Sequence, residues 1–194
     1  KLLEGERVTW LEGQCVSYGQ ATPYLPILEI LRANFQIEES DNPLQIREKL
    51  RRGVRQLDAS LETILPFLGE LFAISFEDEA LKKLDPKAKR QKTFEAIRAL
   101  TAAGSHRRPQ VVIIEDLHWI DRTSEDCLAF LIESLAGMPL VLRTTHRSGY
   151  SVRWADKTYY AQIALGLLTD SDADAMLATL LGTRDLPPEL TRLA

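Results

Sequence analysis

Residues 111–121 read Val-Val-Ile-Ile-Glu-Asp-Leu-His-Trp-Ile-Asp, and this stretch decides the fold class. Four consecutive aliphatic residues are typical of a strand that is buried on both faces of a parallel sheet. The strand is predicted to end in two carboxylates, Glu115 and Asp116. Because ligands of open α/β sheets bind beyond the carboxyl ends of the strands, these two side chains fall where chemistry is expected.

A helix and a second buried strand follow this stretch. Residues 139–145 read Pro-Leu-Val-Leu-Arg-Thr-Thr, another largely aliphatic run. Between the two strands, Thr123 and Asp126 have capping-box spacing and predict the start of a helix. One face of that helix is predicted to carry Leu128, Leu131, Ile132 and Leu135. Strand, helix and strand in this order predict a right-handed parallel α/β unit.

The first half of the chain is predicted to be one strand followed by helices. A β-branched and aromatic run over 7–16 indicates the strand. Apolar residues then recur at helical spacing in 25–35, 46–57, 61–72 and 94–100, and the last of these helices is expected to end near Gly104. The helical part therefore forms an insertion between strands of an α/β fold.

The last part of the chain contains two further predicted elements. Residues 160–167 are expected to form one more strand, and Thr169 and Asp172 to cap a helix that Gly182 closes. Residues 1–5 resemble the end of a helix, and 187–194 begin a helical pattern that stops without a cap. Both ends look cut, so we expect a fragment of a longer protein.

Composition excludes several classes of function. The chain of 194 residues has 24 Lys and Arg against 28 Asp and Glu, a net charge of −4, so no overall basic field favours nucleic acid or anionic lipid. Two cysteines, expected to be small core residues, exclude a disulfide scaffold. The three histidines share no metal-ligand spacing. Without a signal segment or a membrane-length apolar run, we expect a cytoplasmic protein.

Four side chains are the candidate site. Of the adjacent carboxylates Glu115 and Asp116, one can hold magnesium while the other orients a water. Thr145 and Arg147 follow the neighbouring strand, and a polar residue with an arginine beside an acidic pair can sense a γ-phosphate. The alternative is that the carboxylates only end a strand and cap the next helix, and that Arg147 is a solvated loop residue.

Residues 113–121 resemble the Walker B segment of STAND-type P-loop ATPases of the AAA+ lineage, which are signalling ATPases similar to origin-recognition ATPases. Residues 11–26 resemble the second strand of that family and the loop after it, 90–100 the helix before Walker B, and 144–147 the sensor strand. The resemblance implies a P-loop NTPase-like parallel sheet with a helical insertion at about 23–104. A partial nucleotide-binding domain would span 1–168, and a following helical subdomain would begin at 169–194.

The resemblance also implies roles for the candidate residues, with ATP and Mg²⁺ as the bound groups. Glu115 would help to hold magnesium, and Asp116 would position or activate the attacking water. Thr145 and Arg147 would sense the γ-phosphate. His118, Trp119 and Asp121 match the same string, and packing alone is the alternative role for Trp119.

One departure from the family is clear. No Gly-x-x-x-x-Gly-Lys-Ser/Thr string occurs, so the first, Walker A, strand is expected to be missing and the 194 residues alone to be poorly stable and inactive. In full-length bacterial signalling proteins the family module is an ATP-dependent switch. It is joined to class III adenylate or guanylate cyclase domains or to transcription-regulator domains, and to helical repeats.

Nucleotide-dependent self-association is a further partner that the resemblance implies, whereas neither nucleic acid nor a membrane is expected to bind directly. The basic helix faces at 47–55 and 82–92 are interleaved with acidic residues and lack aromatic ones, which favours solvated faces. The alternative function is a non-hydrolysing scaffold or protein-interaction module.

Overall fold

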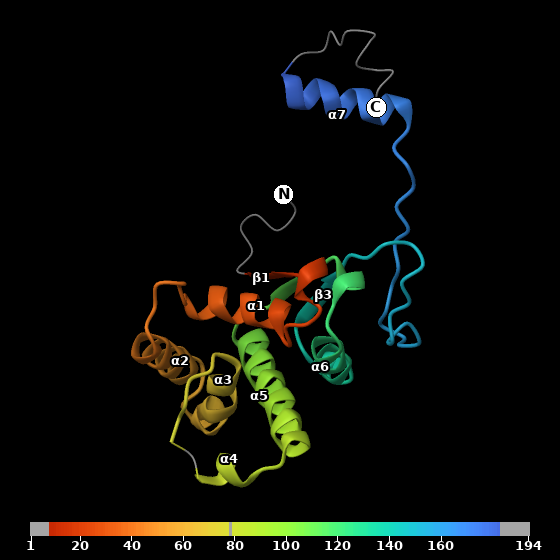
Figure 1. Ribbon diagram of the computed structural model, residues 1–194. Helices are drawn as coiled ribbons and strands as arrows, with labels where there is room; N and C mark the ends of the chain where they lie inside the picture. The colour runs from red at the N-terminus through yellow and green to blue at the C-terminus, as the bar shows by residue number, and fades with distance from the viewer. Residues whose placement is uncertain (1–7, 78, 183–194) are drawn as a thin grey trace. The chain divides into compact units, whose positions relative to one another are not determined.

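The computed structural model describes residues 8–77 and 79–182, which form a mixed α/β structure (Figure 1). The chain divides into two units, Lys1–Tyr159 and Tyr160–Ala194, and each is described by itself. The helical ends predicted at 1–5 and 187–194 lie outside the described residues. Within the described ranges, no helix is long and apolar enough to cross a membrane.

The first unit contains a parallel sheet of three strands in the order β1-β2-β3. The strands are β1 (Thr9–Gln14), β2 (Gln110–Glu115) and β3 (Leu140–Thr144). β2 is central and hydrogen-bonds to both neighbours in parallel register. Its residues 112–114 are buried, as the aliphatic run predicts. The predicted parallel α/β sheet is therefore confirmed.

Three helices cover one face of this sheet: α1 (Leu25–Phe35), α5 (Pro86–Arg107) and α6 (Arg122–Ile132). Their apolar side chains meet those that alternate along the strands, such as Leu11, Val112 and Leu142. α1 lies directly on β1 because Gly13 has no side chain. A Cβ there would stand 2.4 Å from the carbonyl oxygen of Pro26, which no packed structure tolerates.

α2 (Pro43–Leu57), η2 (Ala59–Ile64) and α3 (Leu65–Leu71) form a second layer against α5. The other short helices between β1 and β2 are η1 (Ser17–Gly19) and α4 (Glu79–Lys83). Leu50, Val54 and Leu68 are completely buried in this layer. The helix predicted over 61–72 is divided in two, because Pro66 lies in the first turn of α3 and begins a new helix.

α5 continues past Gly104, where the sequence predicts its end. The helix ends at Arg107, and the amide of Arg108 closes its last turn by donating to the Gly104 carbonyl oxygen at 3.0 Å. Gly104 lets the Gln110 side chain approach this helix closely, since a Cβ at Gly104 would come within 2.6 Å of Nε2 of Gln110 and the amide would have to shift. The glycine therefore marks a close side-chain approach and not a helix end.

The start of α6 also differs from the prediction. Asp121 caps the helix, accepting a hydrogen bond from the amide of Ser124 at 2.9 Å, whereas Thr123 lies within the first turn. Asp126 makes ion pairs with Arg90 at 3.3 Å and Arg153 at 2.5 Å. The capping box predicted from Thr123 and Asp126 is therefore wrong. The helix cap lies two residues before Thr123, at Asp121, which has the same three-residue spacing to Ser124.

The remaining short helices of the first unit are η3 (Leu117–Trp119) and η4 (Leu135–Gly137). After β3 the chain packs against α6. The hydroxyl of Tyr150 donates to Glu125 at 3.1 Å, and that of Tyr159 donates to the carbonyl oxygen of Ile132 at 2.7 Å.

In the second unit, α7 (Asp170–Leu181) begins with the predicted capping box of Thr169 and Asp172 and ends at Gly182, whose φ is +65°. The strand predicted over 160–167 is wrong, since these residues have no regular secondary structure. A strand needs the backbone of a neighbouring strand. The described part of this unit contains no other strand to provide one.

Replacement of Leu50 by alanine tests the importance of the helical layer. We expect a loss of about 2–5 kcal/mol in the free energy of unfolding, because a completely buried leucine leaves a cavity when it is truncated. The measurement is urea denaturation followed by circular dichroism. Leu44→Ala is the matched control on the same helix, since Leu44 is 68% exposed. Equal losses in both variants would contradict the assignment of Leu50 to a packed core.

The burial of the two cysteines predicts that the free energy of unfolding decreases at alkaline pH. Both are buried in the core, as expected. Burial, with the nearby charges of Asp121, Glu29 and Asp116, raises the pKa of Cys15 to about 12, and burial together with Asp121 raises the pKa of Cys127. An unfolded thiol titrates near 8.5, so above that pH only the unfolded state releases these protons.

The free energy of unfolding should therefore fall as pH rises above about 8.5, by up to about 1.4 kcal/mol per pH unit for each thiol. It should be insensitive to the thiols below that pH, where both states are protonated. The measurement is urea denaturation between pH 7 and 10, with Cys15→Ala combined with Cys127→Ala as the comparison. The same slope with and without the thiols would contradict the prediction.

Candidate functional site

The candidate site lies at the carboxyl end of β2, between the ends of its two neighbours. Gln14 of β1 is in register with Glu115, and Thr144 of β3 with Ile114. The ladders continue one residue further on each side. The amide of Cys15 donates to the carbonyl oxygen of Glu115 at 2.9 Å, and that of Thr145 donates to the carbonyl oxygen of Ile114 at 3.1 Å. Regular pairing thus fixes the backbone at the edge where the acidic residues stand.

The hydroxyl of Thr145 joins the two acidic residues. It donates a hydrogen bond to Oε2 of Glu115 and accepts one from the backbone amide of Asp116 at 3.0 Å. The carbonyl oxygen of Thr145 accepts from the amide of Leu117 at 2.7 Å. The structure therefore brings together three of the four predicted site residues, Glu115, Asp116 and Thr145.

Asp116 has a left-handed backbone, with φ of +56° and ψ of +42°. This conformation costs a non-glycine residue about 1 kcal/mol or more, although aspartate tolerates it better than most. It turns the chain sharply from β2 into η3. Within 8–77 and 79–182, the Asp116 carboxylate has no hydrogen bond or ion pair, in contrast to that of Glu115. Of the two carboxylates, that of Asp116 therefore has all of its hydrogen-bond acceptor positions unused by the described residues.

Glu115 is held on its other oxygen by Arg143, a residue that sequence reasoning missed. Nη2 of Arg143 lies 3.1 Å from Oε1 of Glu115. The pair is half-exposed, so it orients the carboxylate more than it stabilises the fold. Strand alternation was the signal available: Arg143 is in register with Ile113, so it faces the same side of the sheet as Glu115, two residues on.

Arg147, the fourth predicted residue, is not brought to the acidic pair. Its side chain is exposed. Its contacts are made by its backbone, since its carbonyl oxygen accepts from the amide of Tyr150 at 3.3 Å and lies 3.0 Å from Nδ1 of His146. Its role as a γ-phosphate sensor stays a prediction.

The rest of the 113–121 string serves largely to shape the turn. Asp121 is buried and uses both carboxylate oxygens on Ser124, whose amide and hydroxyl donate to it. The rings of His118 and Trp119 pack with their centres 5.0 Å apart. Both ring nitrogens of His118 are buried and lack a hydrogen-bond partner among the described residues. Asp121 therefore caps α6 with both of its carboxylate oxygens.

The donor set suits magnesium better than a metal held by protein alone. In the described ranges, no group of three or more His, Cys, Asp or Glu side chains could hold a metal ion. Magnesium, however, keeps several waters and usually takes one or two carboxylates together with substrate phosphates. Asp116 and Glu115, with the Thr145 hydroxyl between them, provide hard oxygen ligands of this kind.

Comparisons with known proteins identify the family of this chain. Residues 1–142 match the family described as AAA ATPase domain. An uncharacterised protein of Rhizobium meliloti (strain 1021) is 42% identical over 88 residues, which is 45% of this chain but only 8% of the length of that relative. No solved structure matches the chain significantly. The family match covers well over half of the sequence. It contains β1, β2 and the carboxyl end of β2 with Glu115 and Asp116, which is called the acidic edge below. The chain belongs to the AAA ATPase domain family.

Proposed function

We propose that these residues are part of an ATP-binding and ATP-hydrolysing switch module of a signalling protein. The observation that carries the proposal is the Thr145 hydroxyl, which ties Glu115 and the Asp116 backbone together at the carboxyl edge of β2 and β3. Family membership implies nucleotide chemistry, usually with Mg²⁺. The connection to signalling rests on the resemblance of 113–121 to the STAND-type Walker B segment.

Asp116 and Glu115 divide the work in this proposal. The Asp116 carboxylate, which has no hydrogen-bond partner in the described part of the chain, accepts a proton from the attacking water or orients it. Glu115, held by Arg143 and Thr145, presents its remaining lone pairs toward a magnesium ion. The ion, when bound, neutralises phosphate charge. Thr145 fixes the separation of the two carboxylates, and Arg147 senses the γ-phosphate from the loop after β3.

The phosphate-binding loop has to come from elsewhere in the parent protein. No Gly-x-x-x-x-Gly-Lys-Ser/Thr string occurs in the 194 residues. The outer edge of β3 has no strand partner in the described residues, so its backbone N–H and C=O groups on that side are unpaired by other strands. An unpaired edge favours the addition of another strand. We propose that a strand bearing the phosphate-binding loop pairs with β3 in the intact protein.

The switch works through attached domains in this proposal. ATP binding stabilises one conformation of the parent chain, and hydrolysis releases it. The attached cyclase or transcription-regulator domain responds to this change of conformation. Helical repeats and nucleotide-dependent self-association complete the set of partners. A non-hydrolysing scaffold is the alternative, and the absence of a phosphate-binding string in these residues is the observation that favours it.

Replacement of Asp116 by asparagine in the parent protein distinguishes an ATP-hydrolysing switch from a non-hydrolysing scaffold. We expect ATP turnover to fall by about 100-fold or more, with ATP affinity within a few-fold of the unmodified protein, because the substitution removes a proton acceptor and keeps the shape. Steady-state phosphate release and calorimetric titration of ATP measure the two effects. Asp156→Asn is the matched control, an exposed aspartate outside the site. Undetectable turnover before substitution would favour the scaffold, and unchanged turnover after it would remove Asp116 from this role.

Thr145 provides a second test of the same edge. Thr145→Val leaves the Asp116 amide without its acceptor and Glu115 without a donor, so we expect turnover to fall and the free energy of unfolding to drop by about 1–3 kcal/mol. Thr145→Ser keeps the hydroxyl and should preserve most of both. Phosphate release and urea denaturation report the two quantities. If serine and valine behave alike, the hydroxyl does not join the acidic pair.

A further inference from the structure

Arg143 is the cation that β3 contributes to the acidic edge. Its Nη2 lies 3.1 Å from Oε1 of Glu115, and within 8–77 and 79–182 its guanidinium makes no other hydrogen bond or ion pair. The side chain is 59% exposed. Because a guanidinium carries five N–H donors in a planar fork, most of the donors of Arg143 remain available for a second anionic group.

Both oxygens of the Glu115 carboxylate have a partner. Oε2 accepts a hydrogen bond from the hydroxyl of Thr145, and Oε1 accepts one from Arg143. The hydroxyl is neutral, whereas Arg143 is a cation on the carboxylate that would hold magnesium. A single positive charge about 5 Å from a divalent cation is repelled by more than the thermal energy even in water. Arg143 and the metal ion therefore compete for Glu115.

The pair between Arg143 and Glu115 is weak enough to exchange. Exposed ion pairs contribute little, because water screens both charges and two long side chains lose freedom. Thr145 is held more firmly, since its hydroxyl also accepts a hydrogen bond from the backbone amide of Asp116 at 3.0 Å. Of the two partners of Glu115, the guanidinium is therefore the one that can leave.

The place of Arg143 in the sheet decides where its side chain can go. β3 pairs with β2 on one side, and its other edge has no strand partner in the described part of the chain. Adjacent strands lie about 4.8 Å apart, so Arg143 is as near to a strand added at the open edge as it is to β2. In the proposed function, that added strand carries the phosphate-binding loop.

The same face of the sheet offers Arg143 no other carboxylate at close range. The three strands contain two acidic residues, Glu115 and Glu12. Glu12 is in register with Ile113 and Ile113 with Arg143, so Glu12 lies two strands away, about 10 Å. Ile113, which stands between them, is buried. Once displaced from Glu115, Arg143 needs an anion from the side of the open edge.

We propose that Arg143 has two positions in the nucleotide site. Without nucleotide it neutralises Glu115, and with nucleotide it leaves Oε1 to magnesium and binds a phosphate group instead. The inference rests on the proposed function, because the phosphate is the one that the nucleotide brings. Arg143 thereby opposes the binding of a metal ion alone and favours the binding of metal and nucleotide together.

Arg143→Gln in the parent protein tests the proposal, because the affinities for metal and nucleotide should change in opposite directions. Without nucleotide, loss of the repelling charge should tighten Mn²⁺ binding by about three- to tenfold, measured by electron paramagnetic resonance of free Mn²⁺. With Mg²⁺ present, loss of a phosphate-binding cation should weaken ATP binding by about tenfold, measured by calorimetry. A structural defect alone would weaken both.

Three further variants locate the effect. Glu115→Gln, made alone and together with Arg143→Gln, identifies the Mn²⁺ that binds at this carboxylate. Arg143→Lys keeps the charge but not the planar fork, so it should restore the weak Mn²⁺ binding and only part of the ATP affinity.

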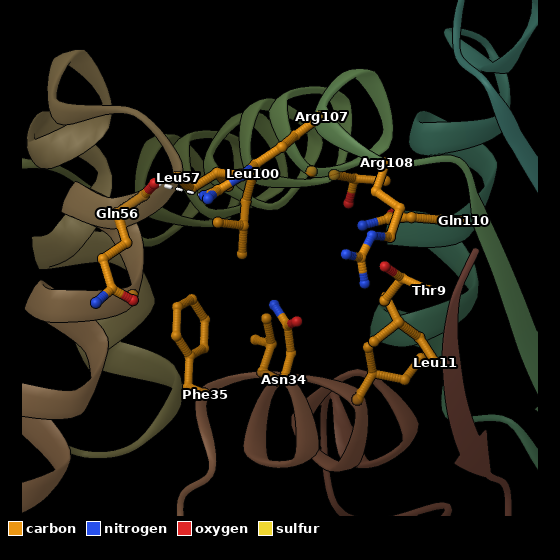
Figure 2. A pocket seen from close by; sticks show the side chains of 15 residues that line it. Thr9, Leu11, Asn34, Phe35, Gln56, Leu57, Leu100, Arg107, Arg108 and Gln110 are labelled. Carbon is orange, nitrogen blue, oxygen red and sulfur yellow. Dashed lines mark hydrogen bonds between the residues drawn. The ribbon is translucent and has the colours of Figure 1, made fainter. Parts of the chain in front are cut away.

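The matched control is Arg108→Gln, which removes the same charge from the opposite end of the sheet. Arg108 is exposed and lines a cleft between α1, α2 and α5 at the amino ends of β1 and β2 (Figure 2). Because charges beyond about 8 Å are largely screened at physiological salt, this variant should change neither affinity by more than about twofold.

The outcomes separate this inference from the proposed function. If the unmodified parent protein binds no ATP in the presence of Mg²⁺, both fail. If it binds ATP, the inference alone fails when Arg143→Gln leaves ATP affinity unchanged, when it does not tighten Mn²⁺ binding in the millimolar range, or when Arg108→Gln has the same effects. Circular dichroism and the melting temperature check each variant, and Arg143→Ala carries the same two expectations should Arg143→Gln fail to fold.

Discussion

The parallel pairing of β2 with strands on both sides is the constraint on which the rest of the first unit depends. Its residues 112–114 are buried, with Ile114 completely so, and its backbone is hydrogen-bonded along both edges. Because the register extends to Cys15 and Thr145, the acidic pair cannot shift along the sheet without breaking both ladders. The geometry at Glu115 and Asp116 is therefore set by backbone pairing, and Thr145 only completes it.

Much of the fold follows from the local pattern of the sequence. The aliphatic run at 111–114 and the helical spacing at 25–35 and 46–57 each predict the observed element, because burial of a regular face dominates there. Thr169 and Gly182 bound α7 for the same local reason, since a cap needs only its own turn. Predictions fail where more than the local pattern decides the outcome: the strand expected over 160–167 has no neighbour, and Gly104, which predicts a helix end, instead lies inside α5 where the Gln110 side chain approaches it.

The sequence predicts the part of the candidate site that lies directly at the carboxyl ends of the parallel strands. Placing Glu115, Asp116 and Thr145 together required only the parallel order of two strands. Arg143 was missed because its role depends on which side of β3 it faces, and Arg147 was placed too close because a loop after a strand has no register to hold it. The cap role of Asp121 could not be separated from a chemical one by sequence, since the same carboxylate in the same string serves either purpose.

The two ends of the sheet differ in charge. Gln110 and Glu115 are the first and last residues of β2, so five residue steps of about 3.3 Å place them about 17 Å apart along the strand. Glu115 and Asp116 stand at the carboxyl end, whereas Arg107 and Arg108 lie at the amino end in a cleft whose lining includes no aspartate or glutamate. Because the local field follows the nearest charges, a cation is attracted to the carboxyl end and repelled from the amino end, although both belong to the same three-stranded sheet.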